Sequence, residues 1–294
     1  MTEKTITYQN SEIFYRITGE GQTVVLIHGF AEDGNVWKSQ VDFLANDFRL
    51  IIPDIPGSGR SEIIAGADIE TYAEVIKHIL DAECQKLLPD QFEDINLIGN
   101  IGDKNAGAFL KEEEPVTVIG HSMGGYITLA FAEKYPQYLD SFGLFHSSAF
   151  PDDEEKKQVR TKAIDFIKTK GTAAFLKTST PGLFTKAFAE AHPASINSLI
   201  EDGKDFSSEA LVQYYQAMMA RPDRTAVLKT FARPILFIIG EHDSAIPLQS
   251  SLRQCYLPTQ SHVHILNNSA HMGMWEEEER SNNILEEFLT QVKQ

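Results

Sequence analysis

The most informative stretch of this sequence is residues 116–131, which read VTVIGHSMGGYITLAF. It opens with β-branched residues that favour a buried strand and closes with an apolar run typical of a helix. Between the two lies Gly-x-Ser-x-Gly, with Ser122 at its centre. A sharp turn with small residues at positions 120 and 124 would expose the Ser122 hydroxyl at the edge of a sheet, beside the positive end of the helix dipole. We therefore predict that Ser122 is a nucleophile that attacks a carbonyl carbon.

A serine hydroxyl needs a base to accept its proton and an acid to orient that base. His271 lies in a polar loop between the last predicted strand and the final helix, and Asp243 directly follows the preceding strand. Both would lie at the carboxyl edge of a parallel sheet, where α/β sites form. Ser122, Asp243 and His271 are therefore the predicted catalytic residues. The alternatives for the acid are Glu241, Asp152 and Asp153.

Two backbone N–H groups are expected to stabilise the negative charge that develops on the substrate oxygen. One is the amide of Met123, which follows the nucleophile. The other is the amide of Phe30, in the loop that follows a strand ending at Ile27.

Short apolar runs alternate with longer amphipathic stretches, the pattern of an α/β fold with a mostly parallel sheet. Eight strands are predicted, at Thr5–Tyr8, Ile13–Thr18, Thr23–Ile27, Phe48–Pro53, Val116–Ile119, Phe142–Phe145, Ile235–Ile239 and His262–Leu266. The predicted core helices are Trp37–Ala45, Ile69–Leu87, Gly124–Lys134, Leu248–Cys255 and Met274–Val292.

Two segments interrupt this core, which we assign to residues 1–149 and 222–294. Residues 150–221 show helical patterns and no strand, which predicts an inserted helical subdomain. Residues 89–114 form a second, unusual insertion, with a faint echo of the stretch around Ser122 that lacks its serine.

The composition is that of an ordinary globular protein, with 42% hydrophobic and 23% charged residues. The formal net charge of −16 disfavours binding to nucleic acid or to an anionic membrane. The N-terminus lacks the apolar core of a signal peptide, and no run of about 18 apolar residues could span a bilayer. Two cysteines, Cys84 and Cys255, allow one disulfide at most. A cytoplasmic protein without nucleic-acid or membrane partners is expected.

Two further groups of residues have simple interpretations. His262 and His264 share one face of a strand and, with His271, could in principle hold a metal ion. No carboxylate stands at metal-motif spacing and no His-Glu-x-x-His occurs, so no metal is predicted. The run Glu276–Glu279 is expected to be a solvated face in the first turn of the last helix.

The motifs and their order resemble the α/β-hydrolase superfamily across nearly the whole chain. The stretch 217–224, AMMARPDR, is similar to the branch of carboxylesterases and enol-lactonases that carry a helical cap. The resemblance implies hydrolysis of an ester or lactone without a cofactor, with segment 150–221 as a lid over the site. Segment 89–114 departs from that branch by lengthening the chain before Ser122. The resemblance rests on His28-Gly29-Phe30, residues 54–61 (DIPGSGRS), Gly120–Gly125, Gly240–Pro247 and His271.

The predicted reaction is acyl transfer from a small, partly apolar ester to Ser122 and then to water. The side chains proposed for the substrate-binding wall, besides Phe30, are Trp37, Phe150, Met218 and Met219. The same triad could instead cleave a thioester, an activated carbon–carbon bond or an aminoacyl amide. A ligand-binding signalling protein with a slow hydrolase site is the alternative outside the enzymes. A monomer or a homodimer is expected.

Overall fold

The computed structural model describes residues 1–84 and 115–292 of the chain, so the predicted insertion 89–114 lies outside the described residues. Its centre is an eight-stranded sheet with the order β1-β2-β4-β3-β5-β6-β7-β8. The pairs β1–β2 and β2–β4 are antiparallel, and the other neighbours are parallel. The predicted fold class, a mostly parallel eight-stranded α/β sheet, is confirmed. The strands are β1 (Thr2–Tyr8), β2 (Ser11–Thr18), β3 (Thr23–Ile27), β4 (Arg49–Pro53), β5 (Val116–His121), β6 (Leu139–Phe145), β7 (Ile235–Gly240) and β8 (Ser261–Leu266).

The α-helices of the described residues fall into two groups. One group flanks the sheet: α1 (Lys38–Leu44), α2 (Ile69–Glu83), α3 (Met123–Lys134), α9 (Thr225–Thr230), α10 (Leu248–Cys255), α11 (Gly273–Glu276) and α12 (Glu278–Val292). The other follows β6: α4 (Glu154–Lys170), α5 (Thr172–Ser179), α6 (Lys186–Ala191), α7 (Pro193–Gly203) and α8 (Ser208–Ala220).

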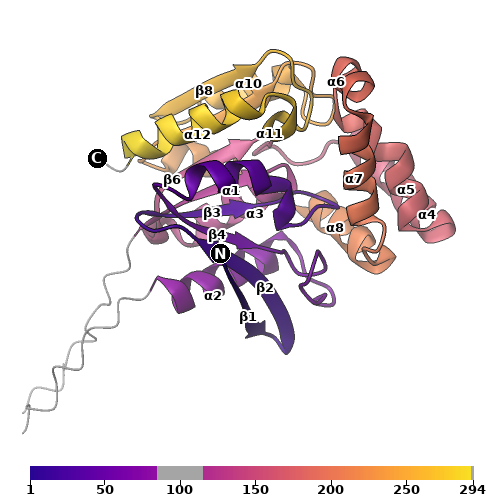
Figure 1. Ribbon diagram of the computed structural model, residues 1–294, viewed down its shortest axis with the longest axis horizontal. Coiled ribbons are helices and arrows are strands. Elements are labelled where there is room, and N and C mark those ends of the chain that lie inside the picture. The colour runs from indigo at the N-terminus through magenta and orange to yellow at the C-terminus, as the bar shows by residue number, and fades with distance from the viewer. Residues whose placement is uncertain (85–114, 293–294) are drawn as a thin grey trace, which may run out of the picture.

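The central strand β3 shows why both faces of the sheet are covered. All of its residues are buried, and successive side chains point to opposite faces. Val25 and Ile27 join a hydrophobic cluster with residues of α2 and α3. Val24 and Leu26 join a second cluster with residues of α1 and α12, which lie side by side in Figure 1. A strand that is buried at every position and apolar from Val24 to Ile27 therefore lies in the middle layer of three.

Helices α4 to α8 gather at one end of the molecule, beyond the carboxyl ends of the parallel strands (Figure 1). They occupy the predicted helical insertion, and residues 150–221, all of which are described, contain no strand. Asp153 caps α4 by accepting the Lys156 N–H at 2.8 Å, and Gly171 ends the helix with a φ of 82°. Local capping residues therefore set the boundaries of the first helix of this helical insertion.

The final predicted helix, Met274–Val292, differs from the structure. It is divided into α11 and α12 at Glu277, whose backbone is non-helical at φ −131° and ψ 59°. Cys84 and Cys255 are both free thiols. Within residues 1–84 and 115–292, no helix has the length and apolarity that a membrane span requires.

Candidate active site

Ser122 lies in the turn between β5 and α3. Its backbone has φ 51° and ψ −115°, a conformation that residues other than glycine rarely adopt. The Ser122 N–H donates to the Phe145 carbonyl at 2.9 Å, and the Ser147 hydroxyl donates to the Ser122 carbonyl at 2.7 Å. These bonds from β6 and the segment after it hold the strained turn at the carboxyl end of a central strand.

The two glycines of the Gly-x-Ser-x-Gly motif have no room for a side chain. A Cβ atom on Gly120 would lie 2.3 Å from the backbone of Gly124. A Cβ atom on Gly124 would lie 2.4 Å from the Ile27 carbonyl oxygen. Only glycine at these two positions lets α3 start so close to β5 and β3.

The His271 imidazole stands between the Ser122 hydroxyl and the Asp243 carboxylate. Its Nε2 lies 2.9 Å from Ser122 Oγ, and its Nδ1 lies 2.8 Å from Asp243 Oδ2. These are hydrogen-bond distances for a nucleophile, a base and an orienting acid. The structure thus brings the three predicted residues together from the carboxyl ends of β5, β7 and β8.

Asp243 is buried, and both of its carboxylate oxygens have partners. Oδ1 accepts the backbone N–H groups of Ala245 and Ile246, each at 2.8 Å, which leaves Oδ2 for His271. Burial alone would raise the pKa of Asp243, but the charge and hydrogen bond of His271 outweigh burial, and the pKa lies below its usual value. An ionised carboxylate is therefore available to hold the His271 Nδ1 proton.

The alternative acids have other positions. Glu241 is exposed to solvent. Asp152 forms ion pairs with Arg160 and Arg221, and Asp153 caps α4. Asp243 is the carboxylate bonded to His271 in the described residues.

Glutamates that follow His271 hold its loop in place. The Glu276 carboxylate accepts the Ala270 N–H at 2.8 Å and the Met272 N–H at 3.2 Å, on either side of His271. Glu277 accepts the Asn268 N–H at 2.8 Å and the Ser269 hydroxyl at 2.9 Å. The prediction of a solvated face for Glu276–Glu279 is wrong for these two residues, because the helix break at Glu277 turns them back toward the loop.

Glu32 and His121 form a buried pair beside Ser122 that no sequence motif singles out. Glu32 Oε2 accepts the Gly29 N–H at 2.6 Å and lies 3.0 Å from His121 Nδ1, while His121 Nε2 donates to the His271 carbonyl at 2.9 Å. Both ring nitrogens face acceptors, an arrangement that favours the doubly protonated imidazolium. Burial would lower the pKa of His121 and raise that of Glu32, but their mutual attraction outweighs burial and reverses both directions.

His146, a second histidine outside the predicted site, has the opposite surroundings. Its ring is fully buried, with Nδ1 3.5 Å from Asp243 Oδ2. The Gly240 N–H points at Nδ1 from 3.0 Å, and the Gly273 N–H points at Nε2 from 3.1 Å. Burial lowers the pKa of His146 well below its usual value, so the ring is neutral. This ring joins the end of β7 to the segment that follows His271.

The two predicted oxyanion donors lie at the site. Met123 is the first residue of α3, and Phe30 lies in the loop after β3, on the wall of the cavity that Ser122 faces. Neither amide donates to a protein acceptor among the described residues. The loop of Phe30 is anchored on both sides, because the Gly29 N–H binds Glu32 and the Ile55 N–H binds His28 Nε2 at 2.9 Å.

The cavity beside Ser122 and His271 has a volume of about 500 Å³. Met218 lies on its wall as predicted, with Phe30, Tyr215 and Ile246. Its remaining lining residues are Glu32, Tyr126, Asp153, Glu155, Lys156, Val159, Arg160, Leu183, Ser244, Ala245, Pro247 and Ser250.

Three of the predicted wall residues do not lie on this cavity. Trp37 is 0% exposed and packs edge-on against Phe145 in the core between the sheet and α1, so its prediction is wrong. Phe150 lines a neighbouring cavity of about 230 Å³ instead. Met219 packs against the core, because successive residues of a helix point about 100° apart and only Met218 faces the cavity.

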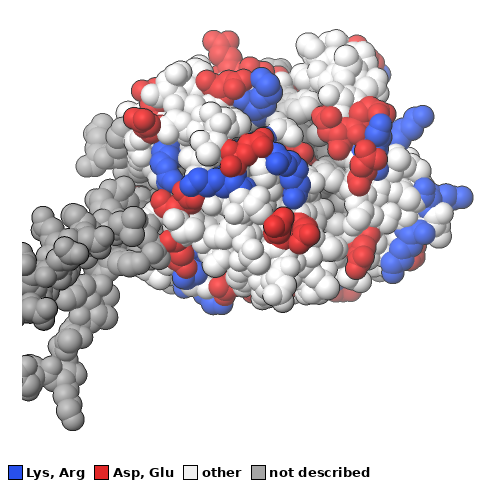
Figure 2. Space-filling view, turned by 60° about the horizontal axis from the view of Figure 1, so that its bottom comes forward, with Lys and Arg blue, Asp and Glu red and all other residues white. Residues whose placement is uncertain are grey.

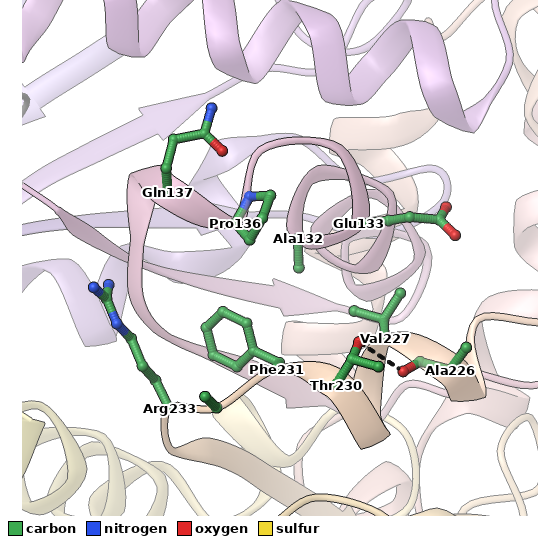
Figure 3. A pocket seen from close by; sticks show the side chains of 10 residues that line it. Ala132, Glu133, Pro136, Gln137, Ala226, Val227, Thr230, Phe231 and Arg233 are labelled. Atoms are coloured by element: carbon green, nitrogen blue, oxygen red, sulfur yellow. Dashed lines mark hydrogen bonds between the residues drawn. The ribbon is translucent and has the colours of Figure 1, made fainter. Parts of the chain in front are cut away.

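A second hollow of about 460 Å³ lies away from these residues, between the end of α3, the segment after it and α9 (Figure 3). Among the described residues that line it, the only hydroxyl side chain is that of Thr230, which donates to the Ala226 carbonyl at 3.0 Å. Its two charged residues, Glu133 and Arg233, lie at separate edges of the hollow (Figure 3). The part of the chain that the structure describes therefore places no activated nucleophile in this hollow.

The described residues contain no group of three or more His, Cys, Asp and Glu side chains that could hold a metal ion. His262 and His264 lie on β8, where His262 packs edge-on against Phe288. On the face of the molecule in Figure 2, acidic and basic side chains are interspersed. That face is therefore not a continuous basic surface of the kind that binds nucleic acid.

The model of the alpha/beta hydrolase family matches residues 24–282. The chain belongs to this family. This alpha/beta hydrolase is 25% identical to a 2-hydroxy-6-oxononadienedioate/2-hydroxy-6-oxononatrienedioate hydrolase of Paraburkholderia phymatum, over 95% of this chain and 91% of that protein.

Two solved structures are similar to this alpha/beta hydrolase over nearly its whole length. A thermophilic esterase from Thermogutta terrifontis, with malate bound, has a TM-score of 0.83 and 26% identity, and the match covers 99% of both chains. The enol-lactonase of Burkholderia xenovorans has a TM-score of 0.82 and 20% identity, and the match covers 98% of this chain and 100% of that one. The second likeness shows the fold alone.

Proposed function

We propose that this alpha/beta hydrolase is a serine esterase that cleaves carboxylic esters or lactones of small, partly apolar compounds. The observation that carries the proposal is the chain of hydrogen bonds from the Ser122 hydroxyl through His271 to Asp243, with distances of 2.9 and 2.8 Å. The strained turn presents Ser122 to a cavity of about 500 Å³, within the range of small-molecule sites.

In the proposed reaction, His271 Nε2 accepts the proton of Ser122 Oγ as Oγ bonds to the substrate carbonyl carbon. The carbonyl oxygen becomes an oxyanion that accepts hydrogen bonds from the amides of Phe30 and Met123. When the carbonyl re-forms, the bond to the alcohol breaks and the alcohol takes the proton from His271. Water then attacks the acyl-enzyme with His271 as base, which releases the acid and restores the Ser122 hydroxyl. Helices α4 to α8 would act as the cap over this reaction.

The 26% identity to the Thermogutta terrifontis esterase supports ester hydrolysis. A second candidate comes from the Paraburkholderia phymatum relative, whose named substrate is an oxo-dicarboxylate. A triad of this kind could also cleave a carbon–carbon bond next to a keto group, and a substrate panel separates the two reactions.

The test is a panel of p-nitrophenyl esters, lactones, thioesters, aminoacyl amides and 1,5-diketones, assayed with the wild type and with Ser122→Ala. We expect several turnovers of the ester in the wild type and a loss of at least about 10³-fold in Ser122→Ala, because the nucleophile is removed. Ser198→Ala, which changes an exposed serine of α7, is the matched control and should keep full activity.

Labelling with a fluorophosphonate gives a test that does not depend on the choice of substrate. We expect the label on Ser122, and none in Ser122→Ala. A label at another residue, or ester turnover that survives in Ser122→Ala, would refute the proposal. A single acylation without further turnover would instead favour the alternative outside the enzymes, a ligand-binding signalling protein with a slow hydrolase site.

A further inference from the structure

Two basic side chains from one helix reach the cavity. Lys156 and Arg160 are four residues apart on α4, so they lie on the same face of that helix, and both line the cavity beside Ser122. Neither takes part in the proposed acyl transfer. Any contact of Lys156 or Arg160 with a bound substrate would therefore be independent of the chemistry of the triad.

The Arg160 guanidinium is held in a fixed orientation. Its Nε donates to Asp152 Oδ2 at 2.5 Å and its Nη2 to Asp152 Oδ1 at 3.4 Å. Its central carbon lies 5.5 Å from the centre of the Tyr215 ring, which stacks on Phe30 with ring centres 4.3 Å apart. The Nη1 group has no hydrogen-bond partner among the described residues. Arg160 thus keeps N–H donors free on the part of the cavity wall that leads to the loop of Phe30.

The charges around Arg160 do not balance. Asp152 is shared with a second arginine, Arg221, whose Nη1 lies 2.9 Å from Asp152 Oδ1. The exposed fractions of the three side chains are 12% for Arg160, 3% for Arg221 and 0% for Asp152. Two guanidinium groups and one carboxylate leave one positive charge in a region with little water. An uncompensated charge in such a place is costly, and a bound anion would lower that cost.

The neighbouring charges do not supply the missing anion. Lys156 Nζ donates to the Ala245 carbonyl at 2.8 Å and forms no ion pair among the described residues. Asp153 and Glu155 are exposed at the rim, where water solvates them. Glu32 is buried in the cavity wall, but its charge is matched by His121.

We propose that Arg160 and Lys156 form an anion subsite in the active-site cavity, and that the substrate is an ester or lactone that carries a carboxylate. This proposal rests on the proposed esterase function and names its substrate class. A carboxylate oxygen would accept from the free Arg160 Nη1, and Lys156 would add its charge. A guanidinium suits this role because its planar donors are fixed in direction and always charged.

The test compares esters that differ only in a terminal carboxylate. In the acyl arm, mono-p-nitrophenyl succinate, glutarate and adipate are each compared with the neutral p-nitrophenyl ester of equal chain length. In the alcohol arm, the acetate ester of 4-hydroxybutanoate is compared with butyl acetate. We expect the wild type to show a kcat/KM about 10- to 100-fold higher for at least one anionic ester than for its neutral partner, the range for a hydrogen bond to a charged group.

In Arg160→Gln the ratio of kcat/KM between the anionic and the neutral ester should fall to about 1, whatever happens to the absolute rates, because the positive charge that recognises the carboxylate is removed. Arg160→Lys should keep part of the preference. Lys162→Gln removes an exposed charge from the same helix and should change neither ester, which makes it the matched control.

The wild-type comparison needs no variant, so it stands even if Arg160→Gln does not fold. Equal kcat/KM for the anionic and neutral members of every pair would overturn the subsite while leaving the esterase intact. An equal loss on both esters in Arg160→Gln would also overturn it. Failure of the wild type to hydrolyse any ester, by contrast, would refute the proposed function itself.

Discussion

Replacement of Asp243 by asparagine tests the role of the acid with almost no change in shape. Oδ1 accepts two backbone N–H groups, from Ala245 and Ile246, each at 2.8 Å. In Asp243→Asn these donors require the amide oxygen at the same position. The amide NH₂ must then face His271 Nδ1, where Oδ2 stood at 2.8 Å. A flipped amide would place its NH₂ against two N–H donors, which costs about 1–3 kcal/mol for each unsatisfied group.

The consequence is a change in the tautomer of His271. Because the amide donates to Nδ1, the ring proton must move to Nε2, which faces the Ser122 hydroxyl at 2.9 Å. A protonated Nε2 cannot accept the serine proton. The same change in a Ser-His-Asp triad lowers kcat about 10⁴-fold. That factor corresponds to about 5.4 kcal/mol in the activation barrier.

The assay is hydrolysis of p-nitrophenyl acetate, with thermal unfolding measured in parallel to show that the variant is folded. Glu241→Gln makes the same kind of change two residues earlier, at an exposed carboxylate, and should keep wild-type activity. If Asp243→Asn were folded and retained activity within about 10-fold of the wild type, then Asp243 would not fix the tautomer of His271.

Two further predictions concern the supports of the triad. In Gly240→Ala the new Cβ would lie 1.9 Å from the Ala270 carbonyl oxygen. We therefore expect denaturant unfolding to show a loss of about 1–3 kcal/mol in stability, and the ester assay to show a fall in kcat as His271 shifts. Gly182→Ala, whose new Cβ would have no neighbour within 4 Å, should change neither the stability nor kcat. The stabilisation from Glu32 and His121 should be complete between pH 4.5 and 6.5, since the pKa of Glu32 is lowered from 4.5 and that of His121 is raised from 6.5. It is lost as pH falls through the folded-state pKa of Glu32 or rises through that of His121. The difference in melting temperature between the wild type and Glu32→Gln should therefore be largest in that window, and a difference that does not vary with pH would contradict the ion pair.

The sheet could be predicted in detail because its strands are marked by local patterns. β3 is apolar from Val24 to Ile27, and both β3 and β7 are buried along their whole length. The nucleophile could be found for a similar reason, because Gly120 and Gly124 mark a turn that only small residues permit. In each case the information lies within a few neighbouring residues.

The supports of the site could not be predicted in this way. Glu32 and His121 are 89 residues apart, and His146 meets Gly273 from 127 residues away. Neither pair has a motif or a fixed spacing, since each is formed only when separate loops meet at the edge of the sheet. The prediction that Trp37 lines the substrate-binding wall is wrong for the same reason, because an aromatic residue near a loop gives no information about which side of the sheet it packs on.

The sequence by itself determined the alternation of strands and helices, the strained turn at Ser122, and the order in which nucleophile, acid and base follow the strands. These features depend on backbone preferences and on residues close in the chain. Only the tertiary structure decided that Asp243 rather than Asp152 bonds His271, and that Asp152 is shared by Arg160 and Arg221. The reason is physical: the environment of a charged side chain is set by whatever folds against it, and those partners are distant in sequence.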